Sequence, residues 1–130
     1  GIIVGPALAP YTTTKHAVVG LTRTLHEDLA DNDKVAVSVL CPGLVQTNII
    51  ERDHLGLDLD ESSIDQHESA KNNAQWLADG VKEGMTPEDL ATIVFKKIER
   101  NEFWILTHPE FVEVYETYAN EITANKNNLD

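Results

Sequence analysis

Apolar residues recur in the first quarter of the chain at steps of three and four, the period of a helix with one buried face. Positions 17, 18, 21, 25 and 29 carry this pattern, which predicts a helix over residues 10–31. A nearly continuous apolar run at 35–41 follows, rich in β-branched residues. Such a run is typical of a strand buried on both faces of a parallel sheet. Pro42 and Gly43 end it.

The middle of the chain has a different pattern. Residues 44–84 are polar, acidic and irregular. Within them, Ser62 or Ser63 is a suitable N-cap for a helix that has Leu77 and Val81 on its apolar side. Long segments of this kind inside a compact domain usually serve as lids or substrate loops. We therefore interpret residues 44–84 as a substrate loop.

The last third of the chain returns to regular patterns. Thr86 is a good N-cap, Pro87 suits the first helical position, and Asn101 is a suitable end for this helix. The apolar run 103–107 predicts a second short buried strand, and a last helix begins near Pro109 and Glu110.

This alternation of helices and strands predicts an α/β fold with a parallel sheet. Two strands are too few for a stable sheet, because each would have an apolar edge without a neighbour. The chain also begins on apolar residues without Met. We therefore expect residues 1–130 to be the C-terminal portion of a larger domain.

Composition excludes several classes of function. The chain has 130 residues, enough for one ordinary domain, and 10 Lys plus Arg against 22 Asp plus Glu give a net charge of -12. That charge repels phosphate backbones and anionic membrane surfaces, so we expect no nucleic-acid or membrane partner. No apolar run approaches the roughly 20 residues that span a bilayer. A single cysteine, Cys41, favours a reducing, cytoplasmic setting and is best interpreted as a small buried hydrophobic residue.

The chemistry-bearing residues are few. The five histidines are not spaced as metal ligands, so we expect no metal site. Tyr11 and Lys15 stand four residues apart, which places them on the same face of the predicted helix. The ammonium group favours the phenolate, so the phenol becomes a usable proton donor and acceptor. A surface tyrosine beside a solvated lysine would give the same spacing, and the pair alone leaves both interpretations open.

A second motif bears on these two interpretations of Tyr11 and Lys15. The predicted strand ends in the run CPGLVQT at residues 41–47, about one helix and one strand after the Y-x-x-x-K motif. In this order and at this spacing the two motifs resemble the short-chain dehydrogenase/reductase family. The likeness covers nearly the whole chain, but only the C-terminal half of a family member.

The resemblance implies a Rossmann-type, doubly wound parallel sheet that binds NAD or NADP. It implies that Tyr11 is the catalytic acid/base for a small alcohol or carbonyl substrate. Lys15 would favour the phenolate and bind the nicotinamide ribose. The cofactor-binding residues would be Tyr11, Lys15, Pro42, Gly43, Val45 and Thr47.

Some family features are absent. The chain has no Gly-rich phosphate turn, and the family's catalytic serine would fall just before Gly1. We therefore expect residues 1–130 alone to be inactive. A nicotinamide-dependent epimerase or dehydratase, and a non-catalytic binding or scaffold protein, remain alternatives. The helix after Tyr11 has more apolar positions than one sheet face needs, so we expect a homodimer or homotetramer at full length.

Overall fold

The structure is a computed structural model that describes residues 1–5, 8–50 and 68–126. It contains four α-helices, one short 3-10 helix and two strands within these ranges. The elements follow in the order α1 (Ala9–Asp28), β1 (Val39–Cys41), η1 (Asn48–Ile50), α2 (Glu68–Glu83), α3 (Pro87–Glu99), β2 (Trp104–Leu106) and α4 (Glu110–Lys126).

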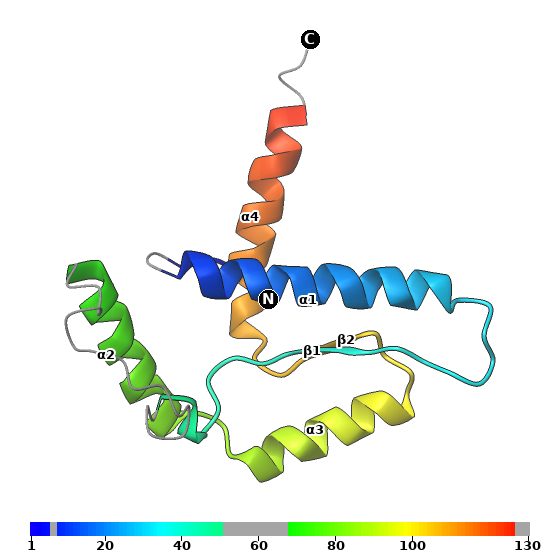
Figure 1. Ribbon diagram of the computed structural model, residues 1–130, viewed down its shortest axis with the longest axis horizontal. Coiled ribbons are helices and arrows are strands. Elements are labelled where there is room, and N and C mark those ends of the chain that lie inside the picture. Colours follow the sequence, from blue (N-terminus) through cyan, green and yellow to red (C-terminus); the bar gives the residue numbers. More distant parts are fainter. Residues whose placement is uncertain (6–7, 51–67, 127–130) are drawn as a thin grey trace.

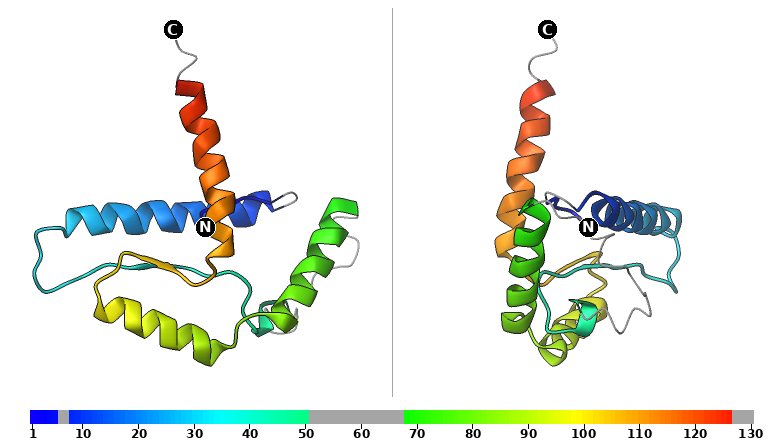
Figure 2. Two further views of the ribbon diagram at one scale, coloured as in Figure 1. Left: turned by 180° about the vertical axis from the view of Figure 1, so that it is seen from behind. Right: turned by 60° about the vertical axis from the view of Figure 1, so that its left-hand side comes forward.

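The two strands form a parallel sheet, as the apolar runs predict. Val39 pairs with Trp104 and Cys41 with Leu106. The sheet lies between α1 on one side and α3 on the other (Figure 1). Helix α4 begins where β2 ends and extends away from the sheet (Figure 2). Helices on both faces of a parallel sheet define the α/β class.

The described core gathers where the strands meet their flanking segments. Ile105, at the centre of β2, is only 2 % exposed. The other buried apolar side chains are Val39, Val45, Val81 and Phe103. Val45 comes from the loop after β1 and Val81 from the end of α2. The loop that follows β1 is thus part of the core.

Local signals explain the ends of α3. The Thr86 hydroxyl accepts a hydrogen bond from the Asp89 amide at 3.2 Å, and Pro87 begins the helix, so the N-cap prediction is confirmed. At the other end Asn101 has a φ of 55°, the left-handed conformation that asparagine tolerates better than most residues. The amide of Asn101 donates to the Ile98 carbonyl and completes the helix end.

Two element boundaries in the described residues differ from the sequence predictions by more than two residues. Helix α1 ends at Asp28 rather than at residue 31, because Asn32 turns the chain: its side-chain oxygen accepts from the amides of Lys34 and Val35. The first strand covers 39–41 rather than 35–41, and Val35 is 49 % exposed. Apolar character alone does not make a strand; a ladder partner is needed, and β2 provides one for three residues. The proposed caps Ser62 and Ser63 lie outside the described residues.

Candidate active site

The first part of the candidate site is Tyr11 and Lys15, in the first two turns of α1. We name these two residues the catalytic pair for the role that the resemblance implies. The Lys15 ammonium nitrogen lies 5.4 Å from the centre of the Tyr11 ring. A cation at this distance from an aromatic face is attracted by the ring. Tyr11 is 52 % exposed, so its phenol is open to a ligand. The helical spacing therefore produces the neighbouring side chains that the sequence predicts.

The second part is the segment 42–47, which follows β1. We name it the cofactor loop for the role that the resemblance implies. Its backbone is fixed by residues far along the chain. Leu44 accepts a hydrogen bond from the Met85 amide at 3.0 Å, and the Gln46 amide donates to the Met85 carbonyl at 2.9 Å. Val45 forms a parallel bridge with Met85 and is buried, whereas Pro42 and Thr47 are exposed. The loop is thus anchored at its centre and open at its ends.

Both parts lie at the same edge of the sheet. Helix α1 runs antiparallel to β1, so the start of the helix and the end of the strand lie towards the same side of the molecule (Figure 1). Ligands of open α/β sheets bind beyond the carboxyl ends of the strands. Within residues 1–5, 8–50 and 68–126, no hydrogen bond, ion pair or ring contact joins the catalytic pair to the cofactor loop. A ligand that touches both would have to bridge them.

One residue at this edge was not singled out by the sequence. His108 follows β2, and its ring contacts the backbone of the cofactor loop at Gly43 and Leu44. Histidine spacing gives no signal of this role, because the contacts span more than 60 positions. The signal that could have found it is topological: neighbouring parallel strands place the residues after their carboxyl ends at the same edge.

Cys41 lies between the strand and the cofactor loop. It is partly buried, and desolvation raises the pKa of its thiol above the ordinary value. The thiol therefore stays protonated at neutral pH, where a protonated thiol is a poor nucleophile. This agrees with its interpretation as a small apolar residue.

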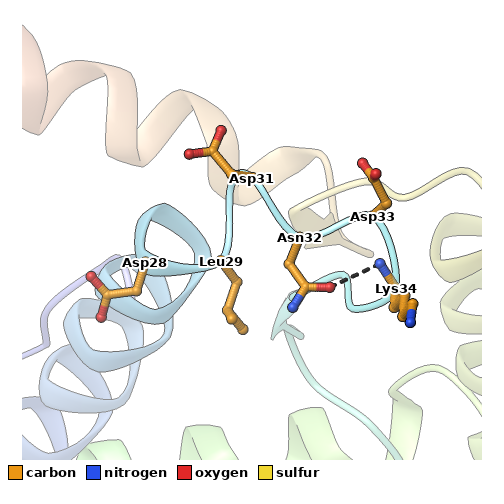
Figure 3. A pocket seen from close by; sticks show the side chains of 6 residues that line it. All are labelled: Asp28, Leu29, Asp31, Asn32, Asp33 and Lys34. Carbon is orange, nitrogen blue, oxygen red and sulfur yellow. Dashed lines mark hydrogen bonds between the residues drawn. The ribbon is translucent and has the colours of Figure 1, made fainter.

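A separate depression lies at the C-terminal end of α1 (Figure 3). Its walls carry three carboxylates and one ammonium group; the lining residues are Asp28, Leu29, Asp31, Asn32, Asp33 and Lys34. It is open to solvent and belongs to the turn that connects α1 with β1.

In the described part of the chain, no group of three or more His, Cys, Asp and Glu side chains is placed to hold a metal ion. None of the described helices is long and apolar enough to cross a bilayer.

The fold, with a candidate site beyond the carboxyl ends of its parallel strands, is that of a Rossmann-type α/β protein. Comparison with known proteins identifies the family. Residues 1–56 match the family model described as short chain dehydrogenase. A crystal structure of a short-chain dehydrogenase/reductase from Burkholderia phymatum in complex with NAD superposes with a TM-score of 0.82 at 30 % sequence identity, over 95 % of this chain and 45 % of that one. The chain belongs to the short-chain dehydrogenase/reductase family.

Curated relatives agree with this assignment. The chain is 30 % identical over 129 residues to the CLA biosynthesis dehydrogenase/reductase of Lactiplantibacillus plantarum. The alignment covers 96 % of this chain and 45 % of the relative. It is 35 % identical over 52 residues to the D-beta-hydroxybutyrate dehydrogenase of Rhizobium meliloti, over 40 % of this chain and 20 % of the relative. The chain thus spans less than half the length of the relatives that it matches.

Proposed function

We propose that the protein containing this chain is an NAD(P)-dependent oxidoreductase that interconverts an alcohol and a carbonyl compound, with Tyr11 as the acid/base. The observation that carries the proposal is the placement of the catalytic pair. A half-exposed phenol lies beside an ammonium group at the sheet edge where ligands of this fold bind. The names of the relatives, dehydrogenases and reductases, support the same class of reaction.

The residues of the edge fit a nicotinamide cofactor. The Lys15 ammonium is exposed and has three hydrogen-bond donors. Among the described residues it lies over the face of the Tyr11 ring, so its donors are available to ribose hydroxyls. The exposed Thr47 hydroxyl and the ends of the cofactor loop offer further polar contacts. A bound nicotinamide would supply or accept the hydride. The NAD complex of the Burkholderia phymatum relative supports the same cofactor class.

The chain's own part in the reaction is proton transfer. In the direction of reduction, the Tyr11 hydroxyl donates its proton to the carbonyl oxygen as the carbonyl carbon receives the hydride. In the direction of oxidation, the Tyr11 phenolate takes the proton from the alcohol as the hydride leaves its carbon. Lys15 holds a positive charge beside the phenolate and so stabilises that form.

The test is the substitution Tyr11→Phe in the full-length protein. Phenylalanine keeps the ring but has no proton to transfer, so turnover should fall at least about 100-fold. The dissociation constant of the cofactor should stay within about threefold, since most cofactor contacts remain. Tyr118→Phe, on the exposed face of α4, is a matched control that should leave turnover unchanged. Full activity of Tyr11→Phe would refute the role of Tyr11, and a wild-type full-length protein that binds cofactor without turnover would support the scaffold alternative.

Four further predictions remain part of this proposal. We propose that residues 1–130 form part of an NAD(P)-binding domain, and that residues 44–84 contribute its substrate loop. We also propose a homodimer or homotetramer, supported by the exposed apolar side chains Val18, Leu21 and Leu25 on α1. Light scattering of the full-length protein tests this assembly. A cytoplasmic location rests on the single cysteine.

A further inference from the structure

The ring of His108 connects two backbone groups of the cofactor loop. The Gly43 amide donates to Nδ1 at 3.0 Å, and Nε2 lies 3.1 Å from the Leu44 carbonyl oxygen. An amide N–H can only donate and a carbonyl oxygen can only accept. These two contacts are therefore satisfied together by one form of the ring, the neutral imidazole with its proton on Nε2.

The ring is itself held in place. The Thr107 hydroxyl lies 2.8 Å from Nδ1, and the Thr107 side chain is buried. The Phe111 ring packs beside the imidazole with a centroid distance of 6.0 Å. Thr107 precedes α4 and Phe111 is in its first turn, so the start of α4 orients the imidazole.

Gly43 fits closely against this pair of rings. A Cβ atom at position 43 would lie 2.6 Å from Cγ of His108 and 2.5 Å from Cε2 of Phe111. Carbon atoms in ordinary contact are about 3.5–4.0 Å apart. The backbone at Gly43 therefore approaches the imidazole as closely as a glycine allows, and the loop cannot shift towards α4 while the ring is in place.

We propose that His108 is a positioning residue for cofactor binding: its neutral ring clamps the Gly43 and Leu44 backbone and so fixes the shape of the cofactor loop. This inference rests on the proposed function. The clamp leaves the exposed ends of the loop, Pro42 and Thr47, free to contact the cofactor. A site held in advance loses less entropy when the ligand binds, so the clamp should act on cofactor affinity rather than on turnover.

The experiment compares three variants of the full-length protein. His108→Phe keeps an aromatic ring but removes both hydrogen bonds. His108→Asn places an amide oxygen near the position of Nδ1, where it can accept from the Gly43 amide. His26→Phe is the matched control, because the His26 ring packs 4.5 Å from the ring of Phe103, at the opposite edge of the sheet.

His108→Phe should raise the KM for NAD(H) or NADP(H) about tenfold, the effect of losing two hydrogen bonds, with kcat at saturating cofactor nearly unchanged. His108→Asn should recover part of this loss, and His26→Phe should keep the wild-type KM. An unchanged KM in folded His108→Phe, or an equal rise in His26→Phe, would overturn the proposal. So would the unfolding of both His108 variants, since the residue would then serve folding alone.

Amide hydrogen exchange separates this inference from the proposed function, because it needs no cofactor. The Gly43 amide should exchange faster in His108→Phe than in the wild type, and at nearly the wild-type rate in His108→Asn. Faster exchange in a protein that does not use a nicotinamide cofactor would refute the proposed function and keep the clamp. Unchanged exchange at Gly43 in His108→Phe would refute the clamp.

Discussion

The catalytic pair lies on an exposed helix face and depends on the local spacing of one helix. The cofactor loop, by contrast, is held by Met85 at its centre and by His108 at its start. The difference corresponds to two requirements of the proposed reaction. A proton donor needs unoccupied hydrogen-bonding groups, whereas a cofactor platform needs an accurate position. Substitutions in the pair should therefore change turnover, and those in the loop should change stability and cofactor affinity.

After Tyr11, the largest effect is expected at Lys15. Lys15→Met removes the ammonium charge beside Tyr11 and should lower kcat/KM about 100-fold. Because the side chain is exposed, the free energy of unfolding should change by less than about 0.5 kcal/mol. Steady-state kinetics and thermal unfolding of the full-length protein measure both quantities. Lys34→Met, which changes another exposed lysine in the turn after α1, is the control; an equal loss of activity there would contradict a specific role for Lys15.

Gly43→Ala should show the opposite behaviour. Its methyl group would press on the rings of His108 and Phe111, and such overpacking costs about 1–3 kcal/mol. Chemical denaturation should record this loss, together with weaker cofactor binding. Gly20→Ala is the matched control, since no heavy atom lies within 4 Å of the added methyl group in α1. Alanine there should stabilise the helix by up to about 1 kcal/mol. Similar stability changes in both variants would remove the distinction between the two regions.

A smaller effect is expected at Thr86, which caps α3 directly after the Met85 anchor of the loop. Thr86→Ala removes the acceptor of the Asp89 amide and should cost about 1 kcal/mol. Thr86→Ser keeps the hydroxyl and should lose little. Thermal unfolding distinguishes the two variants. Equal losses in both would assign the effect to the methyl group of threonine rather than to the cap.

The contrast between local and long-range contacts also explains which features could be predicted from the sequence alone. The proximity of the Tyr11 and Lys15 side chains was predictable because an i, i+4 relation depends only on helical geometry. The cap at Thr86 was predictable for the same reason, as a pattern within one element. The α/β class was predictable because helical and strand patterns alternate along the chain. The clamp by His108 was not, because it joins residues 65 positions apart in the chain. The length of β1 also depended on a distant partner, β2, so residues 35–38 were wrongly assigned to the strand.

The smallest effect is expected in the reactivity of the Cys41 thiol, because Cys41 ends β1 directly before the cofactor loop. Burial raises the pKa of its thiol, so the reactive thiolate is scarce at neutral pH. Iodoacetamide should therefore label the folded protein more slowly at pH 7.5 than the unfolded chain, and the rate should climb as the pH rises. If the clamp holds the loop over this strand end, His108→Phe should speed the labelling, whereas Lys15→Met should leave it unchanged. Equal rates in both variants would mean that access to Cys41 does not depend on the loop.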